Sequence, residues 1–318
     1  MKIVVLDGFT LNPGDLSWKG FEEIGDLTVY DRTPDGLILE RARGAQIILT
    51  NKTPLRKETI EKLTELQYIG VLATGYDVVD VEAAKNNDIV VTNVPEYGST
   101  SVAQMAFALL MELCHHVQRH SDAVKNGAWS QSDDFCFWNY PLIELVGKTM
   151  GIIGLGRIGK QVAQIAVVFG MKVVAYDKYP DKGIDIDNFA WAELDELLRV
   201  SDVVSLHCPL FPDTEGIINH DSLKKMKETA FLINNSRGPL IVEEDLVLAL
   251  NNGEIAGAAL DVLAEEPPGE DNPLLAAENC IITPHISWAT RESRTRLMET
   301  AVNNLGAYLE GQPQNVIN

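Results

Sequence analysis

Residues 154–159 read GLGRIG, and they lie between an apolar segment, TMGII, and an amphipathic one, RIGKQVAQIAVV. In a strand–turn–helix unit, one glycine allows the tight turn, a second lets the backbone approach a pyrophosphate, and a third lets the helix pack closely. The N-terminus of the helix offers N–H groups and a positive dipole to phosphate oxygens. Gly154, Gly156 and Gly159 therefore predict a dinucleotide-binding turn.

Asp177 ends the next strand-like segment, KVVAYD. An acid in this place accepts hydrogen bonds from the adenosine ribose and repels a 2′-phosphate, so it favours NAD over NADP. Lys178 is a cation beside it that could tolerate a phosphate, which leaves the strictness of this preference open. A structural turn followed by a solvated aspartate is the alternative, and the combined arrangement disfavours it.

Three later strand-like segments are each followed by a polar side chain. AFLINN precedes Arg237, AGAALDV precedes Glu265 and Glu266, and CIIT precedes His285. Singly, these would be a surface charge, solvated loop acids and a loop histidine. Because parallel strands present their carboxyl ends at one edge of the sheet, where α/β proteins bind ligands, we expect the three groups to converge beside the dinucleotide.

A guanidinium, a carboxylate and an imidazole suit the reduction of a 2-keto acid. Hydride transfer to a ketone leaves an alkoxide that must be protonated, and histidine, with a reference pKa of ~6.5, can donate that proton near neutral pH. A neighbouring carboxylate favours the imidazolium and orients its ring. Arginine grips a substrate carboxylate through its planar fork. The set predicts His285 as the proton donor.

Strand-like and helix-like segments alternate in two series, which predicts an α/β protein with two doubly wound parallel-sheet domains. We expect a smaller, flavodoxin-like substrate domain at residues 1–98, completed by a C-terminal helix at 290–318. Residues 99–289 are predicted to form a Rossmann NAD-binding domain that includes a linker helix and an arm. The linker is expected as one long helix over residues 99–126, since its apolar spacing is helical.

Composition excludes several classes of partner. The chain has 318 residues and a net charge of −20, which argues against binding nucleic acid or an anionic membrane. The first residues, MKIVVLDGF, read as a strand and not as a signal peptide, and no apolar run approaches the ~20 residues of a membrane span. The four cysteines lack metal-ligand spacing, so we expect no metal and a cytoplasmic protein with reduced thiols.

Seven segments together resemble the D-isomer-specific 2-hydroxyacid dehydrogenase family over nearly the whole chain. They are VLATGYDVVD, STSVAQMAFALL, GKTMGIIGLGRIG, LHCPLFPDTEGIIN, INNSRGPLI, ALDVLAEEPP and TPHISWAT. The resemblance implies that Arg237, Glu266 and His285 are catalytic, with Glu266 preferred over Glu265. Gln104 stands where many members have glutamate, and we expect this to affect local hydrogen bonding only.

The resemblance also implies the binding residues. Arg237 and the backbone amides of Ala73, Thr74 and Gly75 would bind the substrate carboxylate. The positions implied for the cofactor are Ser101, Gly154, Gly156, Arg157, Ile158, Gly159, Asp177, Pro209, Asn235, Asp261 and His285.

Two segments, DFCFWNYPLIELVGKTMGIIGLGRIG and PHISWATRESRTRL, are similar to the glycerate dehydrogenase/hydroxypyruvate reductase branch of the family. This implies reduction of hydroxypyruvate to D-glycerate with NADH. Glyoxylate, pyruvate and 3-phosphohydroxypyruvate remain alternative substrates. A non-enzymatic NAD-sensing interaction protein is a further alternative, since the fold also serves transcriptional corepressors.

Residues 126–148 are rich in aromatic side chains but have neither helical nor strand periodicity. Packing within their own domain is one explanation. We expect instead a two-fold homodimer in which this arm contacts the partner, because interface cores are enriched in aromatic residues. The family resemblance agrees with this and allows Trp138 to reach the substrate pocket of the partner.

Overall fold

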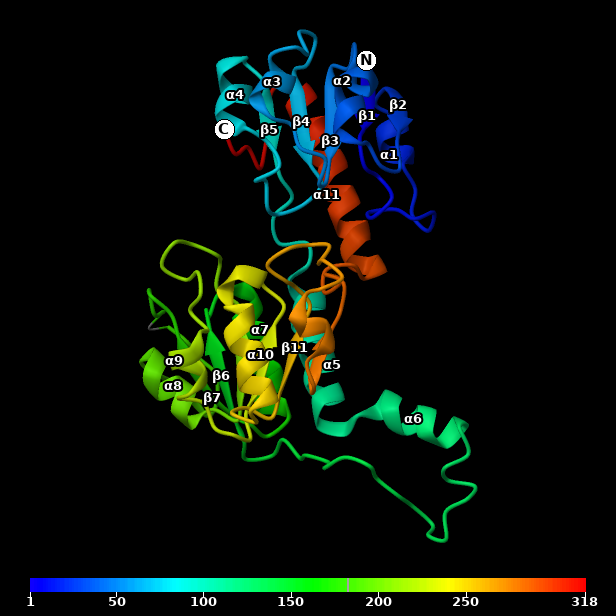
Figure 1. The fold of residues 1–318 in the computed structure, drawn as a ribbon. Coiled ribbons are helices and arrows are strands. Elements are labelled where there is room, and N and C mark those ends of the chain that lie inside the picture. The colour runs from blue at the N-terminus through cyan, green and yellow to red at the C-terminus, as the bar shows by residue number, and fades with distance from the viewer. Residues whose placement is uncertain (182) are drawn as a thin grey trace. The chain divides into compact units, whose positions relative to one another are not determined.

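The computed structural model describes residues 1–181 and 183–318, which form two compact units. Unit 1 comprises Met1–Gly98 and Trp288–Asn318, and unit 2 comprises Ser99–Ser287. Each unit contains one parallel sheet with helices on both faces (Figure 1). The predicted fold class, α/β with two doubly wound parallel sheets, is confirmed.

The sheet of unit 1 has five parallel strands in the order β2-β1-β3-β4-β5, which is the flavodoxin-like order. The strands are β1 (Lys2–Val5), β2 (Asp26–Val29), β3 (Ile47–Thr50), β4 (Tyr68–Val71) and β5 (Val90–Thr92). Strands β3 and β4 are buried along their full length, because helices cover both of their faces.

Two groups of helices cover the sheet of unit 1. On one face lie α2 (Ile38–Ala42), α3 (Lys57–Ile60) and α4 (Val81–Asn86), with η1 (Asp35–Leu37) before them. On the other face lie α1 (Lys19–Glu22) and α11 (Arg291–Leu309), the C-terminal helix. Leu297 and Leu305 of α11 are buried against Ile47 and Tyr68, so the end of the chain completes the core of its beginning.

The sheet of unit 2 has seven parallel strands in the order β12-β11-β10-β9-β6-β7-β8. They are β6 (Thr149–Ile153), β7 (Lys172–Tyr176), β8 (Phe189–Trp191), β9 (Val203–Leu206), β10 (Phe231–Asn234), β11 (Gly257–Leu260) and β12 (Cys280–Ile282). This is the dinucleotide-binding order with one further strand at the edge, and the order reverses between β6 and β9. Strand β8, at the edge of the sheet, has only three residues.

Helices also cover both faces of the sheet in unit 2. One face packs against α5 (Ser99–His115) and α7 (Arg157–Val168). The other packs against α8 (Leu194–Val200), α9 (His220–Leu223) and α10 (Glu243–Asn251), with the short helices η2 (Gly238–Leu240) and η3 (Pro273–Ala276) in the loops. In the described part of the chain, no helix is both long and apolar enough to cross a membrane.

The prediction of one helix over residues 99–126 is wrong. Helix α5 ends at His115, and α6 (Val117–Lys125) begins after His116, which adopts the left-handed conformation with φ +48°. The returning chain stabilises this break, because the Ile143 N–H donates to the Cys114 carbonyl and the ring of His116 lies 4.6 Å from that of Tyr140. Helix α6 and residues 126–148 therefore project from the body of unit 2 as an arm (Figure 1).

Candidate active site

The glycine turn between β6 and α7 has the form that its sequence predicts. A Cβ atom on Gly154, whose φ is +92°, would lie 2.4 Å from the backbone nitrogen of Cys208, and one on Gly159 would lie 2.3 Å from the Gly154 carbonyl oxygen. A Cβ on Gly156 would meet no atom within 4 Å. Protein packing thus requires two of the glycines, while the third leaves its backbone open at the start of α7. This arrangement fits a pyrophosphate.

The carboxylate of Asp177 holds this turn. Its Oδ2 accepts the Leu155 N–H at 2.9 Å, and its Oδ1 accepts the Tyr179 N–H at 3.0 Å. The sequence had predicted a ribose acceptor, but it gave no sign that the same side chain also binds the glycine turn. A substitution of Asp177 will therefore alter both the ribose site and the turn.

Lys178, the cation that left the coenzyme preference open, is paired with Asp213. This contact raises the pKa of the Lys178 ammonium and lowers the pKa of the Asp213 carboxyl, chiefly through their shared hydrogen bond. Lys160 is likewise paired with Asp181 at 3.0 Å. Lys178, which follows β7, and Lys160 of α7 are thus both engaged by aspartates.

His207 and Cys208 follow β9, and their backbone lies beside Gly154 of the glycine turn. The His207 Nε2 lies 2.8 Å from the hydroxyl of Ser205, and burial lowers the pKa of His207 to about 4. Burial also raises the pKa of the Cys208 thiol to about 11. Both groups are therefore neutral near pH 7. The sequence analysis did not identify these two neutral side chains as part of the site. The segment LHCP, at the end of a predicted strand, could have indicated them.

Asn235 lies at the end of β10 and contributes a second sign of a ligand. Its Nδ2 donates to the Val102 carbonyl of α5 at 2.8 Å, next to buried Ser101. Its Oδ1 is buried and has no hydrogen-bond partner among the described residues. A buried acceptor without a partner is costly, so this atom fits a donor on a bound ligand.

Pro209, in the exposed loop after β9, accepts the Thr214 hydroxyl through its carbonyl at 2.7 Å.

Glu266 and His285 are in direct contact. The His285 Nδ1 lies 2.6 Å from Glu266 Oε2, and Glu266 Oε1 accepts the Leu263 N–H at 3.1 Å. The side chains are 35% and 31% exposed, so the pair is anchored yet open to a small molecule. With Nδ1 engaged by the carboxylate, Nε2 is the ring nitrogen that can reach a substrate. Glu265 is exposed, and the structure brings Glu266 to the imidazole.

Arg237 lies in the loop after β10 and is exposed. Its Nη1 donates to the Ser236 carbonyl at 2.8 Å. The next residue, Gly238, packs so tightly that a Cβ atom there would lie 2.0 Å from the Leu263 carbonyl carbon. Gly238 therefore lets the Arg237 loop lie against the segment that leads to Glu266. The sequence analysis did not identify Gly238. Its place directly after Arg237 in INNSRG could have indicated a close approach of the backbone.

Ala73, Thr74 and Gly75 follow β4 in unit 1, at the carboxyl edge of its sheet. The Ala73 carbonyl accepts the Val94 N–H at 3.0 Å, and the Thr74 hydroxyl donates to the Val94 carbonyl at 2.9 Å. The Thr74 carbonyl accepts from Asn93 Nδ2 at 2.7 Å. None of these bonds uses an N–H group of the segment, so they fix its shape without occupying its donors.

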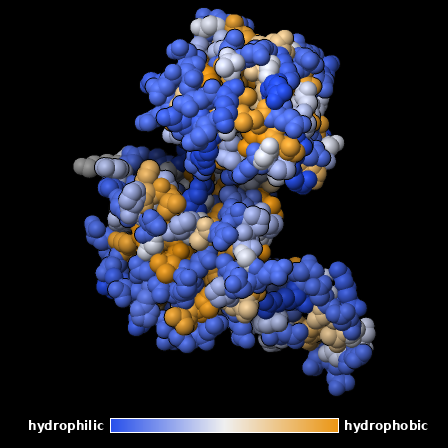
Figure 2. Space-filling view, turned by 45° about the horizontal axis from the view of Figure 1, so that its top comes forward, coloured by the Kyte–Doolittle hydropathy of each residue, from blue (hydrophilic) through white to orange (hydrophobic). Residues whose placement is uncertain are grey.

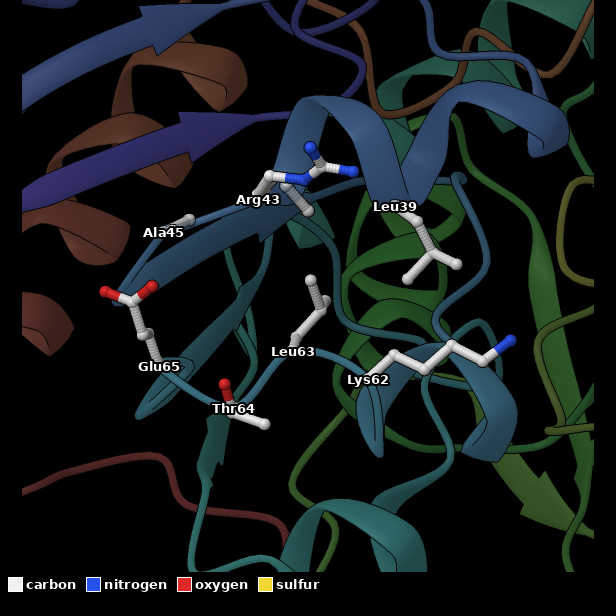
Figure 3. Close-up of a pocket in the computed structure, with 9 residues that line it drawn as sticks. Leu39, Arg43, Ala45, Lys62, Leu63, Thr64 and Glu65 are labelled. Carbon is white, nitrogen blue, oxygen red and sulfur yellow. The ribbon is translucent and has the colours of Figure 1, made fainter.

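A hollow of about 290 Å³ lies elsewhere in unit 1 (Figure 3). Its lining comes from the segments that precede β3 and β4, including Arg43, Lys62 and Glu65. It therefore lies at the amino edge of the sheet, opposite Ala73–Gly75, and contains none of the predicted site residues. We do not assign it to the candidate active site.

The arm exposes apolar side chains. Phe135 is 89% exposed and Trp138 is 65% exposed. Apolar residues gather on the arm (Figure 2). A hollow of about 370 Å³ lies between α6 and the chain that returns from it. This hollow is lined by His115, Val117, His120, Val124, Trp129, Cys136, Phe137, Trp138 and Leu142. Contiguous exposed apolar surface of this kind marks an interaction site more often than ordinary surface.

Comparison with known proteins agrees with this geometry. The family model described as D-isomer specific 2-hydroxyacid dehydrogenase, NAD binding domain, matches residues 107–287. A hydroxypyruvate reductase of Blautia hydrogenotrophica is 57% identical over the full length of both chains. A glycerate dehydrogenase of Methylorubrum extorquens is 40% identical over 99% of this chain and 98% of its own. The structure of a D-lactate dehydrogenase from Aquifex aeolicus, complexed with NAD and lactic acid, has a TM-score of 0.82 and 29% identity, covering 98% of this chain and 96% of that one.

Proposed function

The chain belongs to the D-isomer specific 2-hydroxyacid dehydrogenase family and is an NAD-dependent enzyme, and we propose that it reduces hydroxypyruvate to D-glycerate. The observation that carries the choice of substrate is the 57% identity, over the full chain, to a hydroxypyruvate reductase. Glyoxylate, pyruvate and 3-phosphohydroxypyruvate are the competing substrates.

We propose His285 as the proton donor in this reaction. Bound NADH supplies the hydride that reduces the keto carbon. The His285 imidazolium then gives its Nε2 proton to the alkoxide oxygen, and Glu266 holds the ring through Nδ1. The 2.6 Å contact between these two side chains supports the assignment.

We propose that the substrate carboxylate is bound by two kinds of donor. Arg237 would grip it through its guanidinium and polarise the keto group. The backbone N–H groups of Ala73, Thr74 and Gly75 would add neutral donors. A protein with a net charge of −20 needs such local donors to bind an anionic substrate.

Unit 2 is proposed as the NAD-binding domain and unit 1 as the substrate domain. Gly156 and the start of α7 would take the pyrophosphate, Asp177 the adenosine ribose, and the unpartnered Oδ1 of Asn235 a donor of the cofactor. The remaining proposed cofactor contacts are Ser101, Gly154, Arg157, Ile158, Gly159, Pro209, Asp261 and His285.

We propose that the enzyme is a cytoplasmic homodimer formed through the arm. The exposed aromatic residues and the apolar hollow of the arm support this, because interface cores are enriched in aromatic side chains. Trp138 would then contribute to the substrate pocket of the partner.

The proposed function is tested by following NADH absorbance with a panel of 2-keto acids. Hydroxypyruvate should give the highest kcat/KM, and NADPH should be a poorer donor than NADH. His285→Gln should reduce turnover by roughly 10²–10⁴-fold while NADH binding persists. Near-normal turnover in that variant would remove His285 from the mechanism, and a higher kcat/KM with another keto acid would replace hydroxypyruvate.

A further inference from the structure

His120 of α6 connects the start of the arm to the chain that returns from it. Its Nδ1 lies 3.2 Å from the His115 carbonyl oxygen and 3.0 Å from the His116 carbonyl oxygen, at the break between α5 and α6. Its Nε2 accepts the Asn139 N–H at 3.2 Å. The two nitrogens of one ring therefore join the helix break to a residue that lies 19 positions further along the chain.

The partners of the ring assign its tautomer. Both groups that face Nδ1 are carbonyl oxygens, which accept hydrogen bonds, so Nδ1 must carry a proton. The group that faces Nε2 is a backbone N–H, which donates, so Nε2 must present its lone pair. Because Nδ1 is anchored on the helix break, the position of the Nε2 acceptor is fixed as well.

The bond to Nε2 is made directly after Trp138, the side chain proposed to enter the substrate pocket of the partner. A peptide unit is planar, so holding the Asn139 N–H fixes the plane that begins at the Cα atom of Trp138. The next residue, Tyr140, is held from the same helix, since its ring lies 4.6 Å from that of His116 and 5.9 Å from that of His120. The backbone that carries Trp138 is therefore fixed immediately after it.

Trp138 depends on this support because solvent surrounds most of it, with 65% of its surface exposed. An exposed side chain on an unrestrained backbone loses conformational freedom when it contacts a ligand, and this loss weakens binding. A backbone that is fixed before binding avoids most of the loss. The hydrogen bond from Asn139 to His120 supplies such a restraint where the tryptophan is attached.

We propose that His120 is a positioning residue that acts through the Asn139 N–H to aim Trp138 at the substrate pocket of the partner. This inference rests on the proposed function, in which Trp138 contributes to that pocket. It goes further, because it assigns part of the affinity for the keto acid to a histidine that does not itself touch the substrate.

His120→Asn separates the roles of the two ring nitrogens. The asparagine amide can still donate to the carbonyls near Nδ1, but it is too short to place an acceptor where Nε2 lies. We expect KM for hydroxypyruvate to rise by about fivefold, the factor that one hydrogen bond of ordinary net strength produces. The kcat and the Kd of NADH should stay within about twofold, because the arm carries none of the proposed NADH contacts.

Two further variants are controls for this substitution. His120→Gln restores an acceptor near the position of Nε2, so its KM should return to within about twofold of the wild type. His220→Asn makes the same exchange at an exposed histidine of the same unit, the first residue of α9, and should leave KM and NADH affinity unchanged. Helix α6 contains no buried residue, so the substitutions at His120 leave the core of unit 2 intact.

Hydrogen exchange tests the bond without any measurement of activity. Asn139 is exposed, so its amide should lose the protection of this hydrogen bond in His120→Asn and exchange about fivefold faster. In His120→Gln and His220→Asn the amide should exchange near the wild-type rate.

A double-mutant cycle asks whether His120 acts through Trp138. If it does, His120→Asn should add nothing to the KM of Trp138→Ala, because the side chain that it aims is already absent. Two independent effects would instead multiply, and the KM of the double variant would then exceed that of Trp138→Ala by about fivefold. Such multiplication would overturn the proposal.

Three other results would also overturn it. They are wild-type exchange of the Asn139 amide in His120→Asn, a wild-type KM in that variant beside a raised KM in Trp138→Ala, and dissociation of the His120→Asn dimer in sedimentation, which would show that His120 stabilises the interface itself. A wild-type KM in Trp138→Ala would refute the proposed shared pocket and the inference with it, whereas faster exchange of Asn139 would still show that His120 holds the arm. A wild type that reduces no keto acid would refute the proposed function itself.

Discussion

Asp177→Ala should weaken NADH binding far more than NADPH binding. The substitution removes the carboxylate that accepts the Leu155 N–H at 2.9 Å and that would accept a ribose hydroxyl. It also removes the negative charge that would repel a 2′-phosphate. NADH binding is therefore weakened by the loss of both the turn support and the ribose hydrogen bond. NADPH binding is weakened by the loss of the turn support, but it is strengthened because the carboxylate no longer repels the 2′-phosphate.

The size of the effect follows from the hydrogen bonds. A bond to a charged group contributes about 1.5–3 kcal/mol. Asp177 is only half-buried, so we take the lower part of this range, and we neglect the exposed bond to Tyr179 because water replaces it. Two such bonds at about 1.5 kcal/mol each give a total of about 3 kcal/mol, which corresponds to a rise of roughly 150-fold in the Kd of NADH.

Fluorescence titration with each coenzyme measures both affinities, and kcat/KM with a fixed keto acid measures the consequence for catalysis. Asp213→Asn is the companion variant. It releases Lys178, so it should strengthen NADPH binding severalfold and leave NADH unchanged. Asp195→Asn removes the same charge from another exposed ion pair, with Lys225, and should alter neither affinity. An Asp177→Ala variant that binds NADH as tightly as the wild type would refute the reasoning.

Three further outcomes are expected. Glu266→Gln should lower kcat at neutral pH by about tenfold or more, because the imidazolium loses a charged partner. Glu265→Gln should have the kcat of the wild type, and the reverse result would assign the carboxylate partner of His285 to Glu265. Trp138→Ala should raise KM for the keto acid without weakening NADH binding, and sedimentation of the wild type as a monomer at micromolar concentration would refute the shared pocket. Burial lowers the pKa of His207 to about 4 from 6.5, so the unfolded state binds the proton more readily and stability declines with falling pH inside that window. The free energy of unfolding should fall by about 2 kcal/mol more in the wild type than in His207→Gln between about pH 7 and pH 5, and equal losses in chemical unfolding would contradict the burial argument.

Much of the fold was predictable because its signals are local. A β-branched run such as KVVAY predicts a strand without reference to the rest of the chain. The turn and the helix that follows it are predicted in the same way by the glycines at 154, 156 and 159. The break at His116 was not predictable, because it depends on a bond from Ile143 and a ring contact with Tyr140, both distant in sequence. Helical periodicity continues through the break, so the pattern alone gives no boundary.

The candidate site divides in the same way. The strand ends place Arg237, Glu266 and His285 at one edge, and the sequence predicted that. The bonds of Asp261 to residues 283–287, and of Asp177 to Leu155, were not predictable. Each depends on the register between neighbouring strands and on loop conformation, neither of which is encoded in local spacing. A buried aspartate at a strand end looks the same in sequence whether it contacts a ligand or the backbone.

The packing of α11 into unit 1 has a consequence for the synthesis of the protein. The first 98 residues leave the ribosome long before the helix that covers one face of their sheet. Translation adds ~5–20 residues per second, so α11 is synthesised roughly 10–40 seconds after the first 98 residues. During this time Leu297 and Leu305 are not yet present to cover the apolar side chains of Ile3, Val5, Ile47, Leu49 and Tyr68. The nascent chain therefore exposes an apolar sheet face, which chaperones can bind, during that interval. A protein truncated before α11 would keep this face exposed and would be prone to aggregate, even with unit 2 complete.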